Sequence, residues 1–184
     1  ILGTFSNISG GSPDAYNTII GSHTSTIQGA GSQRSSILGG GNNLVKTGHS
    51  QSVILGGSGL STTKSNEVVV PNLTISGSAV GKVGVLTDAA GTTTMDCSLG
   101  NFFTLAMPAG GSTTLTPSNI QAGQTINVKI TQNATPSTIA FAASVDFEGG
   151  TAFAVSTGAG QVDVMTFISF DGTTLQATGL KNFS

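Results

Sequence analysis

Tyr16-Asn17-Thr18-Ile19-Ile20-Gly21 is the stretch of sequence that decides the fold, because its last three residues return at a nearly constant spacing. Successive tripeptides of two aliphatic residues and a glycine lie 18, 18 and 17 residues apart. A regular period of this kind indicates a stacked architecture in which each repeat forms one coil. The four tripeptides are Ile1-Leu2-Gly3, Ile19-Ile20-Gly21, Ile37-Leu38-Gly39 and Ile54-Leu55-Gly56.

A second apolar position follows each tripeptide, five to seven residues after its second aliphatic residue. It is surrounded by the small polar residues and glycines that favour turns. Each period is therefore predicted to contain two short strands and two turns. The second positions are Ile8, Ile27, Leu44 with Val45, and Leu60.

The paired aliphatic residues determine what the coil must do with its two faces. Neighbouring side chains on a strand point to opposite faces, so each pair places one aliphatic side chain on either side. A coil this narrow has room inside for one row, and burying one such side chain is worth roughly 1.5 to 3 kcal/mol. A row of four, worth on the order of 6 to 12 kcal/mol per chain, therefore favours association of identical chains. The alternative is a monomeric solenoid whose second row is covered by the rest of the chain.

The composition favours an all-β fibrous or surface protein. Charged residues make up 8% of the 184 residues, whereas ordinary domains hold roughly 25%. Serine and threonine together occupy 49 positions and glycine another 27, which favours tight turns and a hydroxyl-rich surface. Helical spacing of apolar residues is not sustained anywhere, while strand-like alternation recurs.

Charge and cysteine content exclude several classes of function. With 6 basic and 8 acidic residues, the basic side chains are scattered and form no phosphate-binding patch, so no nucleic-acid partner is expected. No apolar run is long enough for membrane insertion. The single cysteine, Cys97, is predicted to be a buried structural thiol, and no cofactor is expected. Because the chain starts in the middle of a repeat, we expect it to be part of a longer protein.

Three segments differ in sequence pattern: a repeat stalk over residues 1–60, a collar over 61–100 and a compact head over 101–184. The collar contains a predicted hairpin, with Val85-Leu86-Thr87, a turn at Asp88 to Gly91 and a return through Met95. Seven strands with short connections predict a jelly-roll-like β-sandwich for the head. These strands are expected near residues 102–107, 113–116, 125–131, 138–142, 153–156, 162–170 and 174–178.

Both halves of the chain resemble known fibrous proteins. The Ser- and Gly-rich units, such as Ser35-Ser36-Ile37-Leu38-Gly39-Gly40, look like the head repeats of trimeric phage fibres and, more distantly, of trimeric autotransporter adhesins. The second half is similar to a terminal domain of phage tail-fibre proteins. The motifs behind that similarity are Leu99-Gly100-Asn101-Phe102-Phe103, Ala122-Gly123-Gln124-Thr125, Val128 to Gln132, Gly149-Gly150-Thr151-Ala152, Val162 to Phe167, and Leu180-Lys181-Asn182-Phe183.

The resemblance implies a parallel homotrimer with a β-roll or β-helical stalk and a distal globular head. It also implies a virion location, an extracellular site of action, other virion proteins as partners through a preceding segment, and host-surface attachment. This chain departs from the family in having no tryptophan, which removes the usual aromatic sugar-stacking residue. The residues assigned to the trimer core are Ile1, Leu2, Ile19, Ile20, Ile37, Leu38, Ile54 and Leu55.

Candidate contact residues lie in two loops of the head. Asp146, Glu148 and Asp171 are predicted to accept hydrogen bonds from a host glycan or protein. The spacing of Asp146 and Glu148 would also suit a pair of glycosidase carboxylates, but a chain with so little aromatic surface is expected not to be an enzyme. His23 and His49 do not occupy equivalent positions of the repeat, so they are only weak metal candidates.

The function predicted from the sequence is that of a homotrimeric bacteriophage fibre or spike component that attaches to a host surface through its head. Two alternatives stay open. One is a purely structural or decoration fibre without receptor binding, and the other is a glycan-depolymerising spike.

Overall fold

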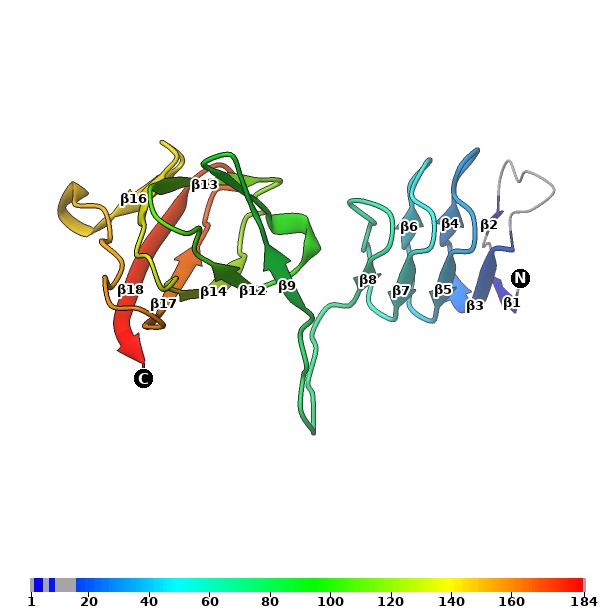
Figure 1. The fold of residues 1–184 in the computed structure, drawn as a ribbon. Helices are drawn as coiled ribbons and strands as arrows, with labels where there is room; N and C mark the ends of the chain where they lie inside the picture. Colours follow the sequence, from blue (N-terminus) through cyan, green and yellow to red (C-terminus); the bar gives the residue numbers. More distant parts are fainter. Residues whose placement is uncertain (1, 5–6, 9–15, 184) are drawn as a thin grey trace. The chain divides into compact units, whose positions relative to one another are not determined.

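The computed structural model describes residues 2–4, 7–8 and 16–183, and the chain forms two compact units, Ile1–Ser78 and Ala79–Ser184. Strands dominate both units (Figure 1), which confirms the predicted all-β class. The residues of the predicted collar, 61–100, are divided between the two units.

The first unit is a β-solenoid made of two parallel sheets, as predicted for the stalk (Figure 1). Three successive coils contribute one strand to each sheet, the last two described coils contribute only to the larger sheet, and each strand pairs with the equivalent strand of the neighbouring coil. The larger sheet contains β1 (Leu2–Thr4), β3 (Thr18–His23), β5 (Ser36–Leu38), β7 (Val53–Leu55) and β8 (Val68–Val69). The smaller sheet contains β2 (Asn7–Ile8), β4 (Thr26–Ile27) and β6 (Leu44–Val45).

The repeat extends beyond the predicted boundary at residue 60. β8 pairs in parallel with β7, with Val69 opposite Ile54, so the larger sheet gains one more rung after the last tripeptide. The last coil is shorter, because Val68 lies opposite Val53 only 15 residues earlier. The change of period explains why the sequence pattern alone placed the end of the repeat too early.

One aliphatic residue from each strand fills the interior of the solenoid. Five of these side chains have no solvent exposure, and they stack in register from coil to coil. This inner row confirms that the coil has room for only one member of each aliphatic pair. The fully buried residues are Ile19, Ile27, Ile37, Val45 and Ile54.

Buried hydroxyl groups close the corners of the solenoid. The Ser35 hydroxyl donates to the carbonyl oxygens of Gln33 and His49, each at 3.2 Å. One coil later the Ser52 hydroxyl makes the same pair of bonds, to Ser50 and Lys64, also at 3.2 Å. Because buried backbone carbonyls need partners, the single hydroxyl hydrogen at each of these corners is shared between two carbonyls, one of which also accepts from a backbone amide. This accounts for the serine two residues before Ile37 and before Ile54, whereas Asn17 holds the same place before Ile19.

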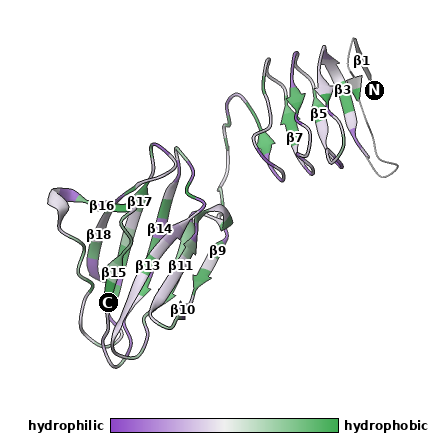
Figure 2. Cartoon of the chain, turned by 90° about the horizontal axis from the view of Figure 1, so that it is seen from above, coloured by the Kyte–Doolittle hydropathy of each residue, from purple (hydrophilic) through white to green (hydrophobic). Residues whose placement is uncertain are grey.

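The second unit consists of a four-stranded and a six-stranded sheet that enclose one hydrophobic core. The first has the order β10-β11-β13-β15, and the second β16-β18-β17-β14-β12-β9. Hydrophobic residues, drawn green in Figure 2, recur along these strands. The strands are β9 (Val83–Leu86), β10 (Asp88–Ala89), β11 (Thr92–Asp96), β12 (Phe102–Ala106), β13 (Ser112–Ser118), β14 (Thr125–Thr131), β15 (Thr138–Phe141), β16 (Val145–Phe147), β17 (Val162–Ile168) and β18 (Leu175–Phe183).

Two stacked sheets agree with the predicted sandwich, but the path of the chain differs from that of a jelly roll. From β9 to β15 the chain alternates between the sheets, and β9, β12 and β14 pair in parallel, as do β11, β13 and β15. Only the last two long strands, β17 and β18, add antiparallel pairs to the six-stranded sheet. The first part of the second unit, β9 to β15, therefore coils with parallel pairing as the solenoid does, and the last part, β17 and β18, is an antiparallel hairpin.

Two local predictions in this unit are corrected. The segment 153–156 is not a strand, and the strand at this point of the chain is instead β16, Val145–Phe147. The predicted hairpin exists only as the short antiparallel pair of β10 with β11, which turns at Ala90 and Gly91. Val85 and Leu86 belong to β9, which pairs with β12 in the other sheet.

Candidate functional site

An exposed aliphatic row runs along the outer face of the larger solenoid sheet. Ile20, Leu38 and Leu55 lie opposite one another on β3, β5 and β7. They are 45%, 40% and 40% exposed, whereas their chain neighbours in the inner row are fully buried. Thr18, Ser36 and Val53 share this face with them, His23 is exposed at the end of β3, and the described strands β3, β5 and β7 contain no Asp, Glu, Lys or Arg. We call Ile20, Leu38 and Leu55 the outer row.

The eight residues assigned to the trimer core thus fall into different environments. Ile19, Ile37 and Ile54 lie inside the coil of a single chain, and the outer row holds Ile20, Leu38 and Leu55 on its surface. Ile1 and the side chain of Leu2 lie outside the described residues. The prediction of self-association therefore depends on the outer row.

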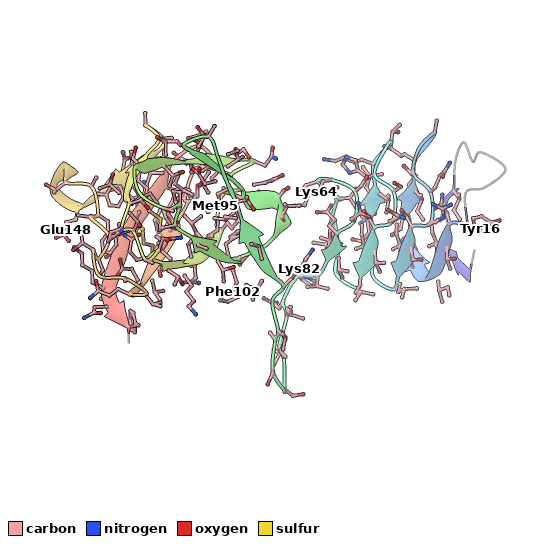
Figure 3. The ribbon with its side chains drawn as sticks, in the orientation of Figure 1. Tyr16, Lys64, Lys82, Met95, Phe102 and Glu148 are labelled. Atoms are coloured by element: carbon pink, nitrogen blue, oxygen red, sulfur yellow. The ribbon has the colours of Figure 1, made fainter. Side chains whose placement is uncertain are left out.

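A groove crosses the outer face of the six-stranded sheet at the end formed by β16, β18 and β17. It has a volume of about 390 Å³, and it adjoins a smaller hollow of about 200 Å³ that shares Phe147, Glu148, Ala177 and Thr178. Glu148 lies at the margin of the second unit in Figure 3. The lining of the main groove is Asp146, Phe147, Glu148, Thr166, Ile168, Gln176, Ala177 and Thr178.

The sheet register brings two of the three predicted contact residues to this groove. Asp146 lies opposite Gln176 in the pairing of β16 with β18, and Glu148 follows directly as β16 ends. Phe147 between them packs edge-on against Phe141, with ring centroids 4.8 Å apart. Among the residues that the structure describes, no basic side chain lines the groove. The site thus combines two carboxylates, an amide and threonine hydroxyls with apolar groups, a combination suited to hydrogen-bond donors on a partly apolar ligand.

Asp171, the third predicted contact residue, is not part of the groove lining. Its carboxylate accepts backbone hydrogen bonds from Thr173 and Thr174, at 2.7 and 2.8 Å. These bonds, that of Thr174 foremost, hold the pKa of the Asp171 carboxyl well below its usual range. The carboxylate therefore stabilises the turn between β17 and β18, and contact with a host stays a prediction for this residue.

The two histidines lie in different positions of the solenoid. His23 is exposed at the end of β3, whereas His49 is half-buried, with its Nδ1 atom 2.8 Å from the Thr62 hydroxyl. Among the described residues no three metal-binding side chains come together. Cys97 is buried, as predicted, and burial raises the pKa of its thiol.

Two buried polar residues that the sequence analysis did not single out, Gln132 and Asp163, bind Ser156 in the segment between β16 and β17. Gln132 donates through Nε2 to the carbonyl oxygens of Ser137 and Ser156, both at 2.8 Å. Asp163, only 2% exposed, accepts bonds from the Ser156 amide and hydroxyl at 2.6 Å and from the Asn182 amide at 2.9 Å. The sequence does contain a sign of the buried role of Asp163: strand alternation places this acidic residue on the same face as the apolar residues Met165 and Phe167.

Replacing Asp163 by Asn is expected to destabilise the protein by about 2 to 4 kcal/mol, because an amide presents donors where the three native partners also donate. Chemical denaturation followed by circular dichroism measures the free energy of unfolding. The matched control is Asp146→Asn, which removes the charge of an exposed carboxylate that has no hydrogen-bond partner in the described structure. Equal stability of the two variants would contradict a structural role for Asp163.

No protein-family model, curated protein or solved structure matches this chain. In the part of the chain that the structure describes, no helix has the length and hydropathy needed to cross a bilayer.

Proposed function

We propose that this chain is part of a homotrimeric bacteriophage fibre or spike that attaches to a host surface through its second unit and has no enzymatic activity. The outer row of the solenoid carries the proposal. Three aliphatic side chains in register, on strands without Asp, Glu, Lys or Arg, are typical of a surface that is covered in the assembled protein. The number of three chains follows the resemblance of the sequence to trimeric fibres.

The proposed assembly is parallel, because the outer row follows the stacking direction of the coils. Neighbouring rungs of a sheet lie about 4.8 Å apart, so parallel copies repeat the same contact at each rung. Ile20, Leu38 and Leu55 are 45%, 40% and 40% exposed, and burying these remaining fractions in three chains contributes on the order of 6 to 11 kcal/mol before the loss of freedom on association is subtracted. That amount offsets a substantial part of this loss of freedom.

The groove at Asp146 and Glu148 is the proposed host contact. Its carboxylates accept hydroxyl hydrogens, while Phe147, Ile168 and Ala177 supply apolar contact area. A shallow site of this kind binds weakly, but three linked sites raise the overall avidity by several orders of magnitude. Trimerisation and attachment are therefore parts of one proposal.

A retention assay of the full chain on candidate host cells and on a glycan array tests the attachment. We expect Asp146→Ala with Glu148→Ala to reduce retention at least tenfold, and Asp171→Asn, assayed in parallel, tests the prediction for that residue. Retention by no plausible host would instead favour the structural or decoration fibre. Shortening of a host polysaccharide during incubation would favour the depolymerising spike.

A further inference from the structure

The six-stranded sheet of the second unit is open at two places, and both carry exposed apolar side chains. β9 is the terminal strand and pairs only with β12. At the opposite end, β16 covers only Leu175–Ala177 of β18, so residues 178–183 have a strand neighbour on one side alone within the described structure. We call these the β9 edge and the β18 edge.

Each edge presents aliphatic or aromatic side chains to solvent. On the β9 edge, Val83 is 57% and Val85 is 79% exposed, and on the β18 edge, Leu180 is 66% and Phe183 is 48% exposed. Unprotected edges with apolar side chains template pairing with another chain, and natural proteins normally block them with charge, proline or a covering segment. β9 contains neither charge nor proline. The β18 edge carries one charge, Lys181, whose Nζ atom lies 5.4 Å from the centroid of the Phe153 ring, and its pairing with β17 is irregular at this point.

The two edges run in the same direction, and each contributes a residue to one row of side chains. β9, β12 and β14 are parallel, and two antiparallel steps through β17 return β18 to the same direction. One outward-facing row crosses the whole sheet from Val85 through Thr104, Lys129 and Val164 to Leu180. A three-fold axis along the strands preserves their direction, so the β18 edge of one copy can meet the β9 edge of the next in parallel.

We propose that the β9 edge of one copy pairs with the β18 edge of the next, joining three six-stranded sheets into a closed ring. The contact is heterologous, because each copy offers one edge of each kind, and a rotation of 120° between successive copies, as in the proposed trimer, closes it into a ring. The occupant of each edge is thus a second copy of this chain.

The proposed contact between the β9 edge and the β18 edge, called the edge joint, is too small to hold the chains together without the solenoid. The exposed parts of its four apolar side chains cover on the order of 300 to 400 Å², less than the roughly 800 Å² per partner of a standard stable interface. The joint therefore rests on the proposed trimerisation through the outer row, which raises the effective concentration of the edges.

A charge-swap series in the full chain tests the joint, with the dissociation of the trimer on dilution measured by sedimentation velocity. We expect Val85→Glu and Leu180→Glu each to raise the concentration of half-dissociation at least tenfold, since each places a charge in the joint. Combining Val85→Glu with Leu180→Lys should restore most of the association, because Glu and Lys reach each other across neighbouring strands even with a shift of register. Combining the two Glu substitutions should weaken it further.

Phe170→Glu is the matched control, because Phe170 is 77% exposed but lies in the turn after β17 rather than on an edge. Unchanged dissociation of both single variants, or equal dissociation of the Glu/Lys and Glu/Glu pairs, overturns the edge joint and leaves the proposed function intact. A wild-type chain that is monomeric overturns the proposed trimer as well. Circular dichroism melting of each variant separates loss of association from loss of folding.

Discussion

Replacing Leu38 by Asp is expected to convert the trimer into well-folded single chains. Leu38 is the middle residue of the outer row, and its side chain projects away from the solenoid interior. Leu38 is 40% exposed, so the substitution removes roughly 0.6 to 1.2 kcal/mol of apolar burial in each of three copies, and it also brings three like charges together in a desolvated contact. The molecular mass at micromolar concentration, measured by light scattering, should fall to that of one chain.

The matched control for this prediction is Leu73→Asp. Leu73 is 73% exposed in the segment that follows β8, outside the outer row. The control variant should keep the mass of the wild-type complex, and both variants should melt as folded β proteins. A Leu38→Asp protein that remains trimeric, or a control that dissociates equally, would show that the outer row is not the interface.

Gly40→Ala is expected to cause the largest loss of folding stability among single glycine substitutions in the solenoid, about 4 kcal/mol or more. A Cβ atom at Gly40 would lie 2.1 Å from the Gly57 carbonyl oxygen and 2.8 Å from the Gly56 carbonyl carbon. Both atoms belong to the backbone of the next coil, so relief requires neighbouring coils to separate. The φ of +77° adds left-handed strain.

The adjacent glycine supplies the control. Gly39 has nearly the same φ, +78°, but the nearest atom to an added Cβ is 4.0 Å away. Gly39→Ala should therefore cost only the left-handed strain, about 1 to 2 kcal/mol. Urea unfolding of the two variants measures the difference, and similar losses for both would mean that the coils are not stacked as closely as the structure shows.

The solenoid was predictable because its period and its paired aliphatic residues impose strong geometric limits. A strand that carries Ile19 and Ile20 side by side must place them on opposite faces, and a coil of this size can enclose only one. The structure agrees, with Ile19 fully buried and Ile20 45% exposed. Local alternation also placed most strands of the second unit within a few residues.

The strand order of the second unit could not be predicted from the local sequence pattern. Alternation in the strand containing Ile126 and Val128 indicates which face is buried, but it carries no information on whether the neighbouring strand is parallel. The short strand Val145–Phe147 was missed because three residues show too little periodicity. Asp146 and Glu148 were nevertheless singled out as candidate contact residues, because their carboxyl groups can be recognised in the sequence. The groove that they line could not be predicted, because it also depends on residues of β17 and β18.

The number of chains in the assembly is the most direct test of the central claim, that the outer row is buried between identical copies. Sedimentation equilibrium of the wild-type chain at micromolar concentration measures it without a label or a ligand. The proposed assembly predicts a single species of three times the 18.2 kDa mass of one chain. A folded species that sediments at 18.2 kDa across that concentration range would contradict it.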